Sequence, residues 1–461
     1  MHQITFRIEG GGDVVAYALP GEILLEAARK ANVAIDAPCS GNGSCGKCRV
    51  RLVEGRLNTS PNRHMTEAES SEGWILACGS TVADSDAVVL VPDIASAYRS
   101  RMRIADLSDR REIEIFNGVR DSIFSTGISM GTGLEKIRLE LSPPDSDDPR
   151  SDLDRIADVL RRETGLVCRP TYLSLKKIPN VVRESGFRFT CLFRREGETA
   201  VLLDLWGDHE EHPVCGLAID IGTTTVSAVT VNIESGEILS GASSGNGQVR
   251  YGADVINRIV EATKEGGIGR LQRAVLEETI IPIIETMCVS AGIRREWIYR
   301  VCVVSNTTMN HLFLGLNPDY IRREPYVPVF MELDGIAASD AGLPVHPCAE
   351  IIIAPNIGSY VGGDITAGTL SSMIWNREEY SLFIDLGTNG EIVFGNRDFM
   401  VGCACSAGPA FEGGDISCGM RAIDGAIESV TIEKDTLDPA LKIERRKAEH
   451  SQGFPPKLII R

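Results

Sequence analysis

The chain has 461 residues, of which 43% are hydrophobic and 24% are charged, a composition that is ordinary for globular proteins. Its length suggests roughly two to four domains. The formal net charge of −17 argues against sequence-independent binding to nucleic acid or to an anionic membrane.

The first residues of the chain show no targeting signal. They contain neither the basic region nor the apolar segment of a secretory signal, and no run of about 18 apolar residues occurs in the sequence. We therefore expect a cytoplasmic protein that does not enter a membrane. In that compartment its 13 cysteines predict metal ligands or buried thiols rather than disulfides.

Residues 1–94 predict a small α+β domain. Residues 4–8 and 14–19 alternate apolar and polar side chains as strands do, with a glycine-rich turn between them. Residues 21–33 have the spacing of an amphipathic helix. A cysteine-rich loop follows, and after it the sequence predicts further strands, the last of them at 87–93.

The next stretch of chain has a different composition. We expect a charged linker over 95–125 and a middle domain over 126–210. Within the middle domain, a break rich in Pro, Asp and Ser precedes an amphipathic helix with Leu153, Ile156 and Leu160 turned inward, and two apolar strands follow. No chemical motif occurs here, so a spacer or docking role is the default interpretation.

Residues 215–461 predict a larger α/β domain. Three consecutive strands with tight turns open it, and helical stretches at 251–266 and 269–292 follow. Residues 380–408 then repeat the opening arrangement of strand, Asp-x-Gly-Thr turn, strand, turn and strand. This internal repeat is the most informative feature of the domain.

Four cysteines are spaced like the ligands of an iron–sulfur cluster. They are Cys39, Cys45, Cys48 and Cys78. A plant-type [2Fe–2S] site has the spacing Cys-x4-Cys-x2-Cys and a distant fourth cysteine. The first gap here is one residue longer, which resembles the adrenodoxin-like branch of that fold. Glycines between the cysteines allow the loop to wrap closely and to point N–H groups at sulfur.

A structural zinc site is the alternative for these cysteines. Such sites usually present two Cys-x2-Cys knuckles on hairpins. The segment has one such pair, in a strand–helix–loop setting. We therefore predict a [2Fe–2S] cluster, which transfers one electron at a time, in a ferredoxin-like domain.

Two similar turns predict a nucleotide site. AIDIGTTTV ends a buried strand at Asp220, and FIDLGTNGEI does so at Asp385. Backbone N–H groups and hydroxyls of such turns can bind phosphate oxygens, while the carboxylate faces the water shell of Mg²⁺. Asp220 and Asp385 would hold Mg²⁺ or position the attacking water. The residues that would hold the phosphates are Gly222, Thr223, Thr224, Thr225, Gly387, Thr388, Asn389 and Gly390.

The two turns, each opening a three-strand meander, resemble the phosphate-binding pattern of the actin/hexokinase/Hsp70 superfamily. That resemblance implies two related domains with ATP and Mg²⁺ between them, whose closure follows the nucleotide state. Two structural hairpins without a ligand are the alternative interpretation.

Other polar residues lie near these motifs. Glu391 is either a solvated hairpin residue or a catalytic one, and Glu412, in the glycine-rich stretch 408–421, either lines the cleft or starts a helix. We expect Asn306 to cap a helix and His311 to be a packed helix residue. Three cysteines lack a fourth partner at metal spacing and are expected to be buried thiols: Cys403, Cys405 and Cys418.

A ferredoxin-like module joined to an ATP-hydrolysing fold indicates ATP-driven electron transfer. Reduction of a low-potential acceptor is uphill, because each roughly 59 mV costs a factor of ten in the equilibrium for one electron. The sequence resembles the reductive activators of corrinoid proteins. The resemblance is carried by CSGNGSCGKC with Cys78, AIDIGTTTV, YGADVINRI, SNTTMNHLFLGLNP, PNIGSYVGGDITAG, FIDLGTNGEI and CSAGPAFEGGDISCGMRA. Residues 95–210 match only in size and placement.

The resemblance implies both a fold and an activity. The fold would comprise a β-grasp [2Fe–2S] ferredoxin domain, a linker and middle domain, and a C-terminal ribonuclease H-like ATPase domain of the actin/hexokinase/Hsp70 type. The [2Fe–2S] domain would accept an electron from a low-potential cellular donor. ATP hydrolysis would then drive reduction of a Co(II) corrinoid on a partner protein to Co(I), in a methyltransferase system of an anaerobe. A homodimer is also implied.

The end of the chain departs from this family pattern. Members continue past the GMRA region with a glycine-rich adenosine motif and closing helices. We therefore expect an ATPase domain over 215–461 that is incomplete at its C-terminus, with the phosphate side of the site present and the adenine side missing. The last residues, 442–461, are basic in an acidic protein and suggest a truncated or frameshifted product.

Three other functions compete with this interpretation. The activases of radical 2-hydroxyacyl-CoA dehydratases share the ATPase fold, but they hold a [4Fe–4S] cluster between subunits and lack a fused ferredoxin domain. A sugar or acid kinase gives no reason for the cluster. A non-catalytic [2Fe–2S] electron carrier or corrinoid-protein binder, with a degenerate ATPase half, is the alternative from a different class.

Overall fold

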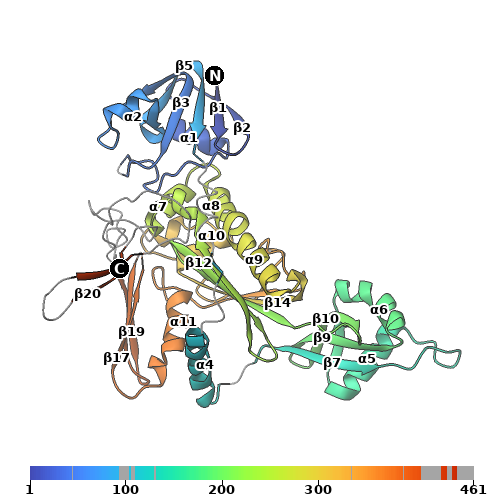
Figure 1. The fold of residues 1–461 in the computed structure, drawn as a ribbon. Helices are drawn as coiled ribbons and strands as arrows, with labels where there is room; N and C mark the ends of the chain where they lie inside the picture. Colours follow the sequence, from blue (N-terminus) through green and yellow to red (C-terminus); the bar gives the residue numbers. More distant parts are fainter. Residues whose placement is uncertain are drawn as a thin grey trace.

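The computed structural model describes most of the chain. The described residues are 1–43, 45–92, 103–104, 110–128, 131–333, 335–387, 389–405, 427–432 and 439–443. They form a central body built on one large sheet, with two smaller sheet domains at its ends (Figure 1). Among them, no helix combines the length and the apolar character needed to cross a bilayer.

The N-terminal sheet has five strands in the order β2-β1-β5-β3-β4. Its elements are β1 (His2–Ile8), β2 (Asp13–Ala18), α1 (Leu24–Lys30), β3 (Arg49–Thr59), α2 (Glu67–Ser71), β4 (Trp74–Leu76), η1 (Ala77–Gly79) and β5 (Ser80–Val91). Helix α1 covers one face of this sheet, and Ile4, Phe6 and Leu24 are fully buried between them. The predicted strands and helix are confirmed, while α2 and β4 add to the prediction.

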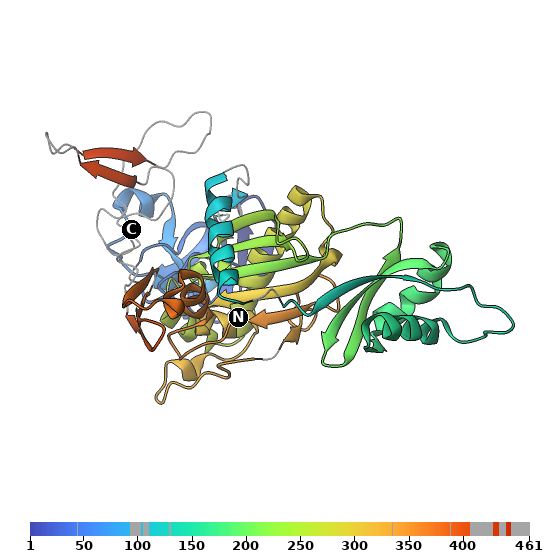
Figure 2. The same ribbon diagram turned by 90° about the horizontal axis from the view of Figure 1, so that it is seen from below.

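A four-stranded sheet in the order β7-β9-β10-β8 projects from the opposite end of the body (Figures 1 and 2). It comprises β7 (Leu134–Glu140), α5 (Asp152–Thr164), β8 (Val167–Pro170), α6 (Tyr172–Glu184), β9 (Arg188–Glu196) and β10 (Thr199–Gly207). The predicted amphipathic helix is α5, which buries Ile156 and Leu160 completely. Helix α6, which contains Pro179 and is capped by Thr171, was not predicted.

The central body is a seven-stranded sheet in the order β15-β16-β14-β11-β12-β13-β6. Its strands are β6 (Arg103–Ile104), β11 (Cys215–Ile221), β12 (Thr225–Asn232), β13 (Ile238–Gly245), β14 (Ile298–Ser305), β15 (Ile336–Ala337) and β16 (Glu350–Ile353). Its helices and helical turns are η2 (Gly247–Arg250), α7 (Val255–Ala262), α8 (Gly267–Val275), η3 (Leu276–Ile280), α9 (Ile281–Ala291), η4 (Arg295–Trp297), α10 (Thr307–Phe313) and η5 (Asp319–Ile321). The largest apolar core of the described chain lies between this sheet and α8 to α10.

The helical stretch predicted over 269–292 is interrupted. A π-helical turn, η3, separates α8 from α9, and Pro282 lies in the first turn of α9. Proline lacks an N–H donor and is best tolerated at the start of a helix. The extra residue of the π turn lets the chain pass Pro282 and continue in nearly the same direction.

A smaller part of the body contains the second predicted meander. It consists of α11 (Gly363–Ser372), η6 (Ile374–Asn376) and the antiparallel strands β17 (Ser381–Leu386), β18 (Gly390–Gly395) and β19 (Met400–Cys405). Helix α11 contacts both β14 and β17, so it joins this sheet to the seven-stranded one. Helix α4 (Arg110–Ser125) lies beside α11 (Figures 1 and 2). Strands β20 (Ile427–Ile432) and β21 (Pro439–Ile443) form a separate hairpin.

Asp204 joins the four-stranded sheet to the central body. This buried carboxylate accepts hydrogen bonds from Lys177 Nζ at 2.5 Å and Tyr299 Oη at 2.8 Å, and His346 Nε2 lies 3.5 Å away. Burial alone would raise the pKa of Asp204, but the hydrogen bonds from His346 and Lys177, the charge of Lys177 and the bond from Tyr299 together hold it below its usual range. The contact between the two sheets is therefore polar, and the negative charge of Asp204 stabilises it. We call this contact the joint at Asp204.

We expect Asp204→Asn to lower the free energy of unfolding by about 2–3 kcal/mol at pH 7, because hydrogen bonds to charged groups contribute about 1.5–3 kcal/mol. The folded-state pKa is depressed, so this stabilisation is complete above the unfolded pKa of about 3.9 and is lost as the pH falls through the folded pKa. The difference between wild type and variant should therefore shrink below about pH 4.

Urea unfolding at several pH values measures this difference. Asp158 of α5 forms an exposed ion pair with Arg150, and Asp158→Asn serves as the matched control. This variant should lower the free energy of unfolding by less than about 0.5 kcal/mol. Equal stability of Asp204→Asn and wild type at pH 7 would contradict the assignment of Asp204 as the joint.

Candidate functional site

The four predicted cysteines meet at the edge of the N-terminal sheet that faces the central body. They lie as two pairs: Cys39 and Cys45 have their sulfurs 3.2 Å apart, and so do Cys48 and Cys78. The first three come from the loop between α1 and β3, and Cys78 comes from η1 after β4. A strand–helix–loop frame thus brings together residues that are up to 39 positions apart.

The loop around the first pair is shaped for sulfur ligation. Gly41 and Gly43 have φ values of 91° and 81°, which favour glycine. A hydrogen bond from the Cys45 thiol, followed by backbone N–H groups of Cys45, Gly41 and Gly43, lowers the pKa of Cys39 to about 4 against the effect of burial. N–H groups that stabilise a thiolate are the donors that a metal–sulfur cluster uses.

The paired sulfurs fit two irons better than one zinc ion. A tetrahedral zinc site needs four ligands around one point. A [2Fe–2S] cluster instead takes two cysteines on each iron. The donor set therefore fits the predicted cluster.

The first predicted nucleotide turn connects β11 to β12. Asp220 lies near the end of β11, and Gly222 begins the turn. A Cβ atom on Gly222 would lie 2.6 Å from the Thr225 carbonyl oxygen, so the tightness of the turn requires glycine. Thr225 is exposed, whereas Thr223 is buried and its hydroxyl oxygen accepts a hydrogen bond from Asn306 Nδ2 at 3.2 Å. Thr223 thus shapes the turn.

Buried polar side chains form hydrogen bonds to the backbone of this turn. Asn246 Nδ2 donates to the Gly222 carbonyl at 2.8 Å, and the guanidinium of Arg258 donates to the Thr223 carbonyl. Arg258 is fully buried and also donates to the carbonyl of Gly252 at 2.9 Å. Two carbonyls of the turn are thus hydrogen-bonded to buried side chains, so the shape of the turn depends on Asn246 and Arg258.

The second predicted turn connects β17 to β18. Asp385 at the end of β17 faces Glu391 of β18 across the hairpin. Asn389 is half-buried and forms a side-chain hydrogen bond with Glu391, and Gly390 is buried. Thr388 lies outside the described residues, so its predicted contact stays a prediction.

The two turns contribute to one group of carboxylates. Burial first, and then the negative charges of Asp364 and Asp385, raise the pKa of Asp220 to about 6. Burial and the charge of Asp385 raise the pKa of Asp364 to about 6. Burial and the charges of Asp364 and Asp385 raise the pKa of Glu391 to about 7. Four carboxylates from β11, α11, β17 and β18 therefore repel one another, and a divalent cation would relieve that repulsion.

Asp364 was not singled out from the sequence, although it lies in the motif PNIGSYVGGDITAG. It stands in the first turn of α11, and Gly362 allows that turn to approach β14 closely. A Cβ atom on Gly362 would lie 2.5 Å from the Cα of Asn306. In the sequence, the pattern of two glycines followed by an acidic residue at a strand-to-helix junction could have indicated Asp364 as a site residue.

The group has the chemistry of a Mg²⁺–phosphate site. Hard cations such as Mg²⁺ prefer carboxylate oxygens and retain several waters. Asp220 and Asp385 lie beside the two glycine turns, so a cation held between them would be next to phosphates bound by the turns. The residues present therefore fit Mg²⁺ and the phosphates of ATP.

Asn306 and His311 have the structural roles that the sequence predicted for them. Asn306 caps α10, because its side chain accepts a hydrogen bond from the Met309 N–H at 2.9 Å. His311 is packed: its ring contacts the Thr307 carbonyl and the Val329 N–H and stacks on Phe330.

The prediction of buried thiols was wrong for Cys403 and Cys405, which are exposed on β19. Both belong to the strand that closes the three-stranded sheet, and the described residues leave this strand open to solvent. Residues 408–421, with Glu412 and Cys418, and the last residues, 444–461, lie outside the described residues.

Comparison with family models divides the chain into four matched regions. Residues 6–83 match the 2Fe-2S iron-sulfur cluster binding domain, and residues 125–212 match the RACo linker region. Residues 215–377 match the RACo middle region, and residues 379–454 match the C-terminal domain of RACo, described as the ASKHA domain. The matches support a [2Fe–2S] cluster in the N-terminal sheet and ATP binding in the C-terminal half.

Comparison with individual proteins agrees with the family models. The chain is 30% identical to the corrinoid activation enzyme RamQ of Eubacterium limosum over 402 residues, covering 87% of this chain and 60% of the relative. It is 28% identical to the [Co(II) methylated amine-specific corrinoid protein] reductase of Methanosarcina barkeri, covering 47% of this chain and 41% of that protein. The chain thus spans 60% or less of these curated relatives.

A solved structure gives the most extensive match. The reductive activator for corrinoid, iron-sulfur protein is 34% identical to the chain and superposes with a TM-score of 0.60, over 96% of this chain and 69% of that one. By its sequence, its domain order and its superposition, the chain belongs to the family of reductive activators of corrinoid proteins.

Proposed function

We propose that the chain carries out ATP-dependent reductive activation of a corrinoid protein, in which cobalt gains one electron and passes from Co(II) to Co(I). The observation that carries this proposal is the direct attachment of the cysteine loop to the body that holds the nucleotide turns. Ala37, two residues before Cys39, donates its N–H to the Arg250 carbonyl at 2.8 Å. An electron-carrier module and an ATPase body are thus in contact within one chain.

The chain's own residues would divide the work as follows. When bound, a [2Fe–2S] cluster supplies one-electron transfer and Mg²⁺–ATP supplies free energy. Cys39, Cys45, Cys48 and Cys78 would hold the cluster. The turn at Gly222 would present N–H groups to phosphate oxygens, and Asp220 and Asp385 would orient the hydrated cation and the attacking water.

Other parts of the proposal rest on the resemblance and on composition. They are a low-potential cellular electron donor, a homodimeric state and a cytoplasmic location. We also propose that residues 1–94 act as the electron-carrier domain and that 95–125 are a linker. Residues 126–210 would form a middle domain with a spacer or docking role, and 215–461 would carry the ATPase chemistry.

Cys45→Ala is expected to abolish cluster binding, because it leaves one iron with a single protein sulfur. Iron content and visible absorbance of the reconstituted chain measure this: about two irons per chain for wild type and near none for the variant. Cys348→Ala, which removes a half-buried cysteine of the central body, should keep both irons. Full iron content in Cys45→Ala would refute the ligand assignment.

The proposed activity is tested by mixing the chain with a Co(II) corrinoid protein, a low-potential reductant and Mg²⁺–ATP, and by following the visible spectrum. Co(I) should form only with ATP. Asp385→Asn should slow its formation by about 10²-fold or more, because it removes a carboxylate that would orient the hydrated cation and the attacking water. Asp398→Asn, an exposed residue of the β18–β19 turn, is the matched control and should react like wild type.

Three outcomes of this assay decide between the candidate functions. Co(I) formation that depends on ATP and on Asp385 supports the activase. Binding to the corrinoid protein without any effect of ATP supports the non-catalytic carrier instead. Absence of both binding and reduction contradicts both functions.

A further inference from the structure

One short segment of the central body contacts both the cysteine loop and the first nucleotide turn. This segment, residues 250–264, runs from the end of η2 through α7 and is called the α7 segment below. Figure 1 shows α7 directly beneath the N-terminal sheet.

The first contact with the cysteine loop is made by backbone atoms. The Ala37 N–H donates to the Arg250 carbonyl at 2.8 Å, and the Ala253 N–H donates to the Pro38 carbonyl at 2.8 Å. Pro38 directly precedes Cys39. These two hydrogen bonds fix the entry of the cysteine loop against the α7 segment.

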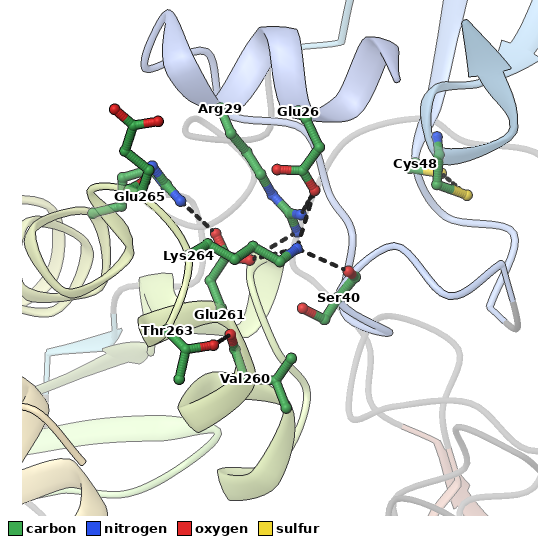
Figure 3. Close-up of polar contacts among 11 residues, drawn as sticks. Glu26, Arg29, Ser40, Cys48, Val260, Glu261, Thr263, Lys264 and Glu265 are labelled. Atoms are coloured by element: carbon green, nitrogen blue, oxygen red, sulfur yellow. Dashed lines mark hydrogen bonds and ion pairs between the residues drawn. The ribbon is translucent and has the colours of Figure 1, made fainter. Parts of the chain in front are cut away.

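The second contact is a network of buried charges. Glu261 of α7 is completely buried and pairs with Arg29 of α1 at 3.3 Å, with Lys264 at 3.1 Å and with Arg270 at 2.9 Å. Figure 3 shows Lys264 reaching from the body toward α1 and the cysteine loop. Its Nζ lies 3.0 Å from Glu26 Oε1 and 3.4 Å from the Ser40 carbonyl oxygen.

These charges form a docking contact between the two parts of the molecule. A buried carboxylate is strongly destabilised when its partners are removed, because the remaining charge is left without compensation. Arg29 supplies part of that compensation from the N-terminal sheet. Separation of the two parts would therefore expose Glu261 and Arg29 to water and disrupt two backbone hydrogen bonds at once.

The other side of the α7 segment holds the nucleotide turn. Arg258, one turn of helix before Glu261, donates to the Thr223 carbonyl and to the Gly252 carbonyl. Gly252 directly precedes Ala253, which binds Pro38. Three consecutive links thus join the turn to the cysteine loop: from Thr223 to Arg258, from Arg258 to Gly252, and from Ala253 to Pro38.

We propose that the α7 segment couples the nucleotide site to the docking of the N-terminal sheet. The coupling rests on the proposed function, since it requires that a nucleotide binds at the Thr223 turn. A phosphate bound there fixes the carbonyl that Arg258 holds, and Arg258 in turn fixes the backbone that binds Pro38. Nucleotide therefore favours the docked arrangement, and docking favours nucleotide by the same factor, because thermodynamic coupling is reciprocal.

The amide protons of Ala37 and Ala253 report docking directly, since both are donated across the contact. Hydrogen exchange of the full, cluster-loaded chain is measured with and without Mg²⁺–ATP. We expect exchange at both positions to slow by about 5-fold or more with nucleotide, the lower end of typical coupling between two sites. Unchanged or faster exchange, in a chain shown to bind ATP, overturns the proposal.

Lys264→Met tests the reciprocal effect. Lys264 is partly exposed, so its removal leaves Glu261 paired with Arg270 and the fold intact. Hydrogen exchange at the Ala37 amide should accelerate. The affinity for Mg²⁺–ATP should fall by about the same factor by which Mg²⁺–ATP slows amide exchange in the wild-type chain. Arg29→Met, which weakens the same contact from the other side, should act in the same direction.

Lys136→Met is the matched control. Lys136 forms a comparable, partly exposed ion pair with Glu234 at 2.7 Å, far from the docking contact. It should change neither the exchange at Ala37 nor the ATP affinity. Loss of ATP affinity in Lys136→Met equal to that in Lys264→Met would overturn the proposal.

The outcomes separate this inference from the proposed function. A chain that binds no ATP contradicts both the function and the coupling, although the effect of Lys264→Met on exchange still measures docking. A chain that binds ATP with the same affinity in wild type and Lys264→Met contradicts the coupling alone.

Discussion

Repulsion among four carboxylates is the constraint on which the site depends. Asp220 belongs to the seven-stranded sheet, Asp385 and Glu391 belong to the three-stranded sheet, and Asp364 begins the helix between them. Burial first, and then the charges of neighbouring carboxylates, raise the pKa of Asp220, Asp364 and Glu391, so the site disfavours three negative charges without a cation. A bound cation would compensate these charges and so stabilise the contact between the two sheets.

The other parts of the molecule are attached to this body by polar contacts. Asp204 joins the four-stranded sheet through Lys177 and Tyr299, and Glu261 joins the N-terminal sheet through Arg29. Buried polar contacts need a defined geometry, and they lose much of their energy when one partner moves. Contacts of this kind suit a protein whose domains keep one relative arrangement and leave it cooperatively.

The sequence predicted the features that depend on local spacing. The first three cysteines and the Asp-Gly-Thr turns are recognisable because their chemistry requires particular residues within about ten positions. Asp364 and the supporting role of Arg258 were not predicted, because their partners come from distant strands and helices. The exposure of Cys403 and Cys405 was missed for a related reason: burial of a strand depends on what covers the sheet, which residues in that strand do not specify.

The central claim is that the chain binds nucleotide between its two turns by means of a cation. Calorimetric titration of ATP into the purified chain, with and without Mg²⁺, measures this most directly. The account predicts one ATP per chain in the presence of Mg²⁺ and a large loss of affinity when Mg²⁺ is chelated. Absence of binding, or binding of equal strength without Mg²⁺, would contradict it.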